Sequence, residues 1–246
     1  MHLKVIACEV LAREVFHCAA EATNTVDIEL YTQGLHDNAA ICRGKLQPRI
    51  DAADPERYDA VVLGYGLCNN AIAGLAAGRT PLVIARAHDC ITLFLGSKER
   101  YAQVFAERPG TYWYTSGWLE YAGRRGERVP YDPKSGLRSS DDFDHAKLVE
   151  QYGEENAEYL MSVLGNWAHN YTHGALVDFP FAQRLGLEER VRSICDEHGW
   201  DLLQVEGDLA LIRRLIDGPW DEDAFLRVEP GQTIAAVSDD RILVAR

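Results

Sequence analysis

The chain lacks an excess of basic residues: 25 Lys and Arg stand against 38 Asp and Glu in 246 residues, which gives a formal net charge of −13. A phosphate-binding surface needs clustered Lys and Arg, so this balance argues against a nucleic acid partner and against an anionic membrane surface. We interpret the acidic residues, which are spread along the chain, as solubilising charge.

Long hydrophobic runs are also missing. No apolar segment reaches the roughly 20 residues of a membrane-spanning helix, and residues 1–8 lack the apolar core of a secretory signal. We therefore expect a cytoplasmic protein with no membrane partner. The six cysteines have no regular spacing, so in a reducing compartment we expect them to be buried, catalytic or metal-bound rather than disulfide-paired.

Short apolar runs alternate with helical stretches, which predicts parallel β-α-β units. The clearest buried strands are 58–64 and 81–85, after earlier strands at 3–7 and 25–31. We predict a Rossmann-like α/β fold with a three-layer parallel sheet. A 2-1-3-4 strand order would place the first, third and fourth strands side by side, and the chain can also be arranged as two similar α/β lobes around a cleft.

Composition divides the chain into three parts. Residues 1–117 are expected to form an N-terminal α/β lobe that carries a Cys/His cluster. Residues 118–143, much of them rich in Gly, Pro, Ser, Arg and Asp, are expected to form a loop excursion. Residues 144–246 form the C-terminal α/β portion, which begins with a helix near 145–164. Within the first lobe, the Ala-rich residues 69–77 predict a helix after the third strand.

Thiols and an imidazole follow neighbouring strands. Cys8 ends the first strand, Cys68 follows the glycine-bearing run at 64–67, and His88 and Cys90 follow the fourth strand. Ligands of parallel sheets bind where the carboxyl ends of the strands meet. Soft N and S donors in this number suit Zn²⁺ or another soft divalent metal. We therefore predict these four residues as metal ligands.

Three neighbouring residues are candidate catalytic groups. In an extended segment residues i and i+2 point the same way, so His88 and Cys90 can grip one ion while Asp89 orients a ligand. Glu9 can act as a general base, or it is an exposed acid in the first turn of a helix. Arg86 can bind a carboxylate or phosphate of the substrate, or it forms a surface ion pair.

Gly64, Gly66 and Tyr112 are candidate cofactor-binding residues. The glycines allow the backbone to approach a bound group closely, and the tyrosine can wall a pocket. The loop holds only part of a G-x-G-x-x-G phosphate-binding pattern, which gives little support to nucleotide binding. Packing is the plain alternative for any cysteine. We expect it for the cysteines in predicted helices, Cys18, Cys42 and Cys195.

Several ordered motifs resemble the family catalogued as domain of unknown function 1638, over nearly the whole chain. They are the runs at 64–68, 86–90, 95–97, 109–113 and 152–157, and the stretch from Gly207-Asp208 to Pro230-Gly231. The resemblance implies one-carbon metabolism, because members accompany corrinoid-dependent methyl transfer. It also implies a corrinoid protein or methyltransferase as partner, with a corrinoid borne by that partner.

The His-x-Cys motif with a distant Cys is similar, separately, to the zinc motif of thiol-alkylating methyltransferases. In those enzymes the metal binds a substrate thiol and lowers its pKa. Here the third Cys precedes the motif and no barrel pattern accompanies it, so the similarity is one of chemistry and not of descent.

Three functions follow as hypotheses. The first is a metal-dependent transferase that uses zinc to activate a thiol or water for group transfer to or from a small molecule, with methyl transfer as the leading reaction. The second is a non-catalytic accessory protein that handles a metal or a corrinoid. The third is a metal-free enzyme with Cys68 or Cys90 as nucleophile and His88 as base.

Overall fold

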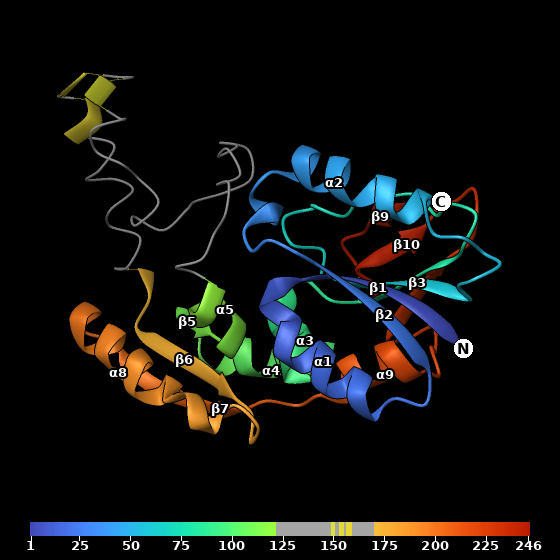
Figure 1. Cartoon of the computed structure of the whole chain (residues 1–246). Coiled ribbons are helices and arrows are strands. Elements are labelled where there is room, and N and C mark those ends of the chain that lie inside the picture. The colour runs from blue at the N-terminus through green and yellow to red at the C-terminus, as the bar shows by residue number, and fades with distance from the viewer. Residues whose placement is uncertain (122–148, 151–152, 155, 159–169) are drawn as a thin grey trace.

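A five-stranded sheet with the order β2-β1-β3-β4-β8 lies at the centre of the computed structural model (Figure 1). Its strands are β1 (His2–Cys8), β2 (Thr25–Tyr31), β3 (Ala60–Gly64), β4 (Leu82–Ala85) and β8 (Phe225–Val228). The first four run parallel, and β8 is antiparallel to β4. The expected α/β class with parallel strands and the expected 2-1-3-4 order are confirmed.

The structure describes residues 1–121, 149–150, 153–154, 156–158 and 170–246. Most of the loop excursion predicted at 118–143, and most of the helix predicted near 145–164, lie outside the described residues. No helix in the described ranges is long and apolar enough to cross a membrane.

The central strands β3 and β4 are buried along their whole length. Their sequences are continuous apolar runs, as is usual for parallel strands that are covered on both faces. The edge strand β2 alternates apolar and polar residues instead. Its Asp27 and Glu29 pair with Arg57 and Lys4, and such charges on an edge strand discourage pairing with another chain.

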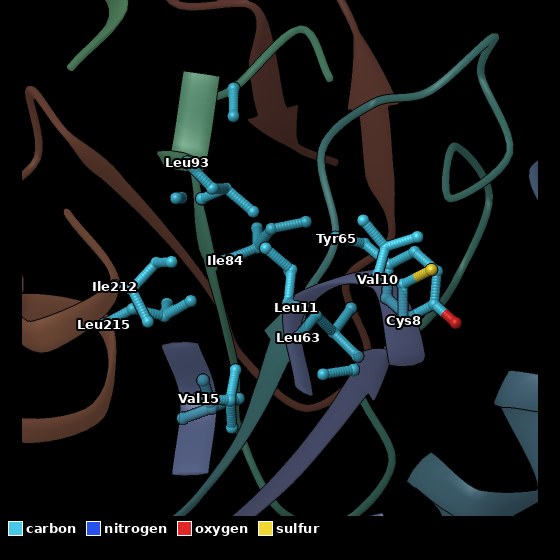
Figure 2. Close-up of a cluster of buried hydrophobic side chains, with 14 of the residues drawn as sticks. Cys8, Val10, Leu11, Val15, Leu63, Tyr65, Ile84, Leu93, Ile212 and Leu215 are labelled. Atoms are coloured by element: carbon cyan, nitrogen blue, oxygen red, sulfur yellow. The ribbon is translucent and has the colours of Figure 1, made fainter. Parts of the chain in front are cut away.

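Helices cover both faces of this sheet (Figure 1). On one face lie α1 (Ala12–Glu21), which follows the 3-10 helix η1 (Glu9–Leu11), α9 (Ala210–Asp217) and the short α3 (Cys90–Leu95); α2 (Ala39–Asp51), after η2 (Leu35–Asp37), lies on the other. The buried side chains of α9 form one stripe: Leu211, Ile212, Leu215 and Ile216. Figure 2 shows Ile212 and Leu215 of this stripe in one buried cluster with residues of α1, α3 and the strands, so burial of an amphipathic face holds the layer in place.

A second sheet of three parallel strands has the order β5-β6-β7. Its strands are β5 (Thr111–Tyr114), β6 (His173–Asp178) and β7 (Asp201–Glu206). Helix α8 (Leu187–His198), after η6 (Gln183–Leu185), packs on this sheet (Figure 1). Helices α4 (Lys98–Glu107) and α5 (Ser116–Tyr121) flank β5 in the chain, and Ser97 is the N-cap of α4.

The helix predicted at 69–77 is wrong, because these residues form turns. Strands β9 (Ile234–Ala236) and β10 (Leu243–Ala245) form an antiparallel pair, and the 69–77 segment bonds to the β9 side of it. The Gly74 amide donates to the Ile234 carbonyl at 2.7 Å, and the Ile234 amide donates to the Leu75 carbonyl at 2.8 Å. Long-range backbone hydrogen bonds thus replace the helical ones that an Ala-rich sequence favours locally.

Candidate functional site

Two backbone hydrogen bonds join the loops that follow β3 and β4. The Leu67 amide donates to the Ala87 carbonyl at 2.8 Å, and the Cys68 amide donates to the His88 carbonyl at 2.9 Å. The contact leaves no space for a side chain at Gly66, where a Cβ would lie 2.6–2.8 Å from backbone atoms of Asp89. These two hydrogen bonds fix the loop that carries Cys68 against the loop that leads to Cys90.

The two glycines predicted to approach a cofactor closely approach the protein itself. A Cβ on Gly64 would lie 2.5 Å from the Cβ of Ala7 on β1, and Gly66 is packed on Asp89. Their freedom from a side chain lets neighbouring segments pack at short range. In the described structure, therefore, each glycine positions the thiol-bearing loop.

Three thiols lie at the carboxyl edge of the five-stranded sheet. Cys8 ends β1 and is 8% exposed, whereas Cys68 and Cys90 are half-buried. Burial raises the pKa of Cys68, and the charge of Asp89 and the neighbouring Cys8 raise it further. Burial likewise raises the pKa of Cys90, and the neighbouring Cys68, Asp89 and Cys8 raise it further, in that order. The three thiols and one carboxylate therefore lie within electrostatic range of one another.

Asp89 fixes the start of α3. Its Oδ1 accepts hydrogen bonds from the Ile91 amide at 2.9 Å and the Thr92 amide at 3.3 Å, and its Oδ2 accepts one from the Tyr101 hydroxyl at 2.9 Å. The extended segment expected over residues 88–90 ends at Asp89, since Cys90 is the first residue of the helix. The carboxylate expected to orient a ligand thus orients the helix that carries Cys90, and it holds Tyr101 beside the thiols.

His88 is exposed and lines a cavity beside Tyr101, with 6.1 Å between the ring centroids. Within the described residues, no group of three or more His, Cys, Asp and Glu side chains is placed so that it could hold a metal ion. The donor chemistry of three thiols suits a soft metal, but the arrangement of these side chains is not a finished metal site.

Two other predicted site residues, Glu9 and Arg86, hold the backbone in place, and the third, Tyr112, lies elsewhere. The Glu9 carboxylate accepts a hydrogen bond from the Gln33 amide at 2.7 Å. Arg86 donates to the carbonyls of Glu222 and Arg241, each at 2.8 Å, and to that of Leu243. Tyr112 belongs to the second sheet, in an aromatic group. Its neighbours, at centroid distances of 5.1–5.8 Å, are Tyr114, Tyr171 and Trp200.

Two buried polar side chains were not foreseen from the sequence. Tyr65 is 3% exposed and Gln33 is 2% exposed, and within the described residues neither side chain has a hydrogen-bond partner. Figure 2 shows Tyr65 beside Cys8, and burial followed by the Cys8 thiol raises the pKa of the Tyr65 phenol. Buried polar atoms of this kind occur where water or a ligand completes a site.

The turn that carries Cys68 is strained. Cys68, Asn69 and Asn70 have φ values of 41°, 54° and 61°, so three consecutive residues with side chains are left-handed. Such a conformation costs about 1–3 kcal/mol per residue and concentrates at functional sites. Asn tolerates this conformation better than most residues because its side chain can form local hydrogen bonds, whereas a Cys side chain offers no such compensation.

Fold and site together define an α/β protein with three thiols at the carboxyl edge of a parallel sheet. The chain belongs to the family described as protein of unknown function (DUF1638), which matches residues 30–216. The match includes the loops with Cys68 and Cys90, whereas Cys8 precedes its first residue. No curated protein and no solved structure matches the chain.

Proposed function

We propose that the thiols of Cys8, Cys68 and Cys90 form the reactive centre of a soft-metal transferase, and that the metal is zinc or a similar divalent ion. The observation that carries this proposal is the pairing of the two strand-end loops, which gathers the thiols beside Asp89. A bound Zn²⁺ would lower the pKa of a coordinated thiol or water and so supply a nucleophile at neutral pH.

The residues around the thiols have supporting roles in this proposal. Asp89 holds the first turn of α3 and the hydroxyl of Tyr101, so it fixes the position of Cys90. The buried Tyr65 hydroxyl is a neutral hydrogen-bond donor near Cys8. His88 lines the wall of the neighbouring cavity, where an entering substrate would meet it.

A metal-free nucleophilic thiol is less well supported. Burial and the charge of Asp89 raise the pKa of Cys68, and burial with the neighbouring Cys68 raises that of Cys90. Each thiol is therefore protonated at neutral pH unless a cation binds beside it. In the transferase hypothesis, the bound metal ion is this cation.

The proposal also covers the place of the ligand, the reaction and the partner protein. We take the five-stranded sheet to act as a Rossmann-like platform whose ligand sits at the strand ends. The acceptor or donor is a small molecule, the leading reaction is methyl transfer, and a partner protein in the cytoplasm carries the corrinoid. A non-catalytic accessory role in metal or corrinoid handling uses the same thiols without turnover.

The test is metal binding by the full chain purified without oxygen. We expect about one Zn²⁺ per chain, and Co²⁺ should give a thiolate-to-metal absorption band. Cys68→Ser and Cys90→Ser should each weaken binding at least about tenfold. Cys195→Ser is the matched control, because this buried cysteine of α8 lies against Gly174 in the second sheet.

Binding below about 0.2 metal per chain, unchanged in the two variants, would overturn the proposal. Stoichiometric metal with transfer of a methyl group from a methylcorrinoid to a thiol supports the transferase. The same metal content with no turnover, across candidate donors and thiols, identifies the accessory role instead. Selective alkylation of one thiol in the metal-free protein at neutral pH would favour metal-free catalysis.

A further inference from the structure

A cavity of about 910 Å³ opens between α4 and the C-terminal segment around residues 238–242. Its volume is within the range of small-molecule sites, about 300–1,000 Å³. His88, Tyr101 and Phe105 line one side, and carboxylates of the C-terminal segment line the other. Nothing in the zinc proposal uses this second wall.

The first wall consists of stacked aromatic rings. Tyr101 and Phe105, one helical turn apart on α4, stack with their centroids 5.1 Å apart and an interplanar angle of 25°. Phe105 is nevertheless 46% exposed. The faces of such rings carry a negative quadrupole that attracts cations, so an exposed aromatic wall suits a positively charged ligand.

The cavity lining as a whole carries an excess of negative charge. Four carboxylates line the cavity against a single lysine: Glu99, Asp223, Asp239 and Asp240. Lys98 pairs with Asp223 at 2.9 Å, and Asp239 pairs with Arg241 at 2.6 Å. Lys98 also donates to the backbone carbonyl of Asp240 at 3.5 Å, whereas among the described residues the carboxylate of Asp240 forms no hydrogen bond or ion pair.

Tyr101 connects the cavity to the thiol site. Tyr101 lines the cavity and donates its hydroxyl to Asp89, the residue that caps the helix of Cys90. Asp89 and the thiols of Cys90 and Cys68 all act electrostatically on the Tyr101 phenol. A ligand held against Tyr101 would therefore contact a residue that is hydrogen-bonded to Asp89.

We propose that this cavity binds a small organic ammonium ion, with the charged head between the aromatic wall and Asp240. A hydrated metal ion gains little from ring faces, whereas an alkylammonium gains from both rings and carboxylates. The role of this ion as substrate rests on the proposed function, since only then does the thiol site act on it. Binding of the ammonium ion does not rest on the proposed function, and this binding is tested separately.

The experiment titrates the metal-free full chain with choline and with 3,3-dimethylbutan-1-ol, a neutral molecule of the same shape, followed by NMR of the ligand. Choline should bind at least about tenfold more tightly than the alcohol. Phe105→Leu keeps an apolar side chain without the ring and should weaken choline binding about three- to fivefold. Phe16→Leu is the matched control, because Phe16 is 53% exposed on α1 and does not line the cavity.

Asp240→Asn should weaken choline binding as well and leave the alcohol unchanged. Equal binding of choline and alcohol, or equal effects of the Phe105 and Phe16 variants, would overturn the proposal. Cys68→Ser should keep full choline binding. A protein that binds no zinc but discriminates choline therefore refutes only the proposed function, and the reverse result refutes only the cation site.

Discussion

At the scale of single residues, Glu14 is the most unusual acid in the described structure. It lies buried in α1, where Ser116 of α5 donates a hydrogen bond to its Oε1 at 3.0 Å. Within the described residues its Oε2 has no partner. Burial raises the pKa of Glu14 from 4.5 to about 7, so the carboxyl is largely protonated below neutral pH in the folded protein.

This shift predicts a stability that falls as pH rises. Between about 4.5 and 7 the folded state holds a proton that the unfolded state has lost, so the free energy of unfolding decreases across that window. The loss amounts to about 3 kcal/mol by pH 7–8. Glu14→Gln keeps the hydrogen bond from Ser116 and should remove this loss, which urea unfolding at several pH values measures.

Glu56→Gln is the control for this series, because Glu56 is an exposed acid. It should leave the pH dependence of the wild type in place. If Glu14→Gln and wild type show the same slope between pH 5 and 7, the buried carboxyl is not the source of the effect.

At the scale of elements, the pairing of the strand-end loops carries the site. Gly66→Ala would place a Cβ 2.6–2.8 Å from the backbone of Asp89, and backbone atoms cannot rotate away. We expect a loss of about 1–3 kcal/mol in the free energy of unfolding, together with weaker metal binding, because the loops separate. Chemical unfolding and metal titration of one preparation measure both.

Gly44→Ala is the matched control. Gly44 lies in α2, where an added Cβ has nothing within 4 Å. This change should raise the free energy of unfolding by about 0.5–1 kcal/mol, since Ala loses less entropy than Gly in a helix. A Gly66 variant as stable as this control would show that the two loops are not in tight contact.

The strands were more predictable from the sequence than the loops that follow them. The apolar runs and the glycine-bearing turn were enough to predict β3, β4 and their parallel order, because burial on both faces leaves a continuous apolar signature. The turns at 69–77 were missed because the backbone of Gly74 and Leu75 bonds to Ile234, far away in the chain. Tyr65 and Gln33 were missed because an unpaired buried atom depends on all its neighbours and leaves no local pattern.

At the scale of the whole molecule, Arg86 joins the sheet to the C-terminal segment. Its guanidinium donates to carbonyls of Glu222, Arg241 and Leu243, so the residue after β4 holds the chain that forms the acidic cavity wall. Sequence placed Arg86 correctly at a strand end, but the groups it binds come from more than 130 residues later. A single sequence carries no signal for such a contact.

Arg86→Met should therefore loosen the C-terminal segment. We expect a loss of about 2–3 kcal/mol in the free energy of unfolding, because three carbonyls lose a charged donor. Limited proteolysis should cut the variant within residues 237–246 faster than wild type. Arg227→Met is the control, because Arg227 is exposed on β8 and pairs only locally with Glu229; equal cleavage of both variants would contradict the role given to Arg86.

The left-handed turn at Cys68, Asn69 and Asn70 has a consequence for how this protein changes over generations. Glycine at any of these positions would relax the backbone, so selection for stability alone drifts toward glycine there. The proposed function requires the thiol, so we expect relatives to carry glycine more readily at 69 and 70 than at 68. A relative with glycine at 69 or 70 but cysteine at 68 would show that the side chain of residue 68 is kept, rather than its backbone conformation.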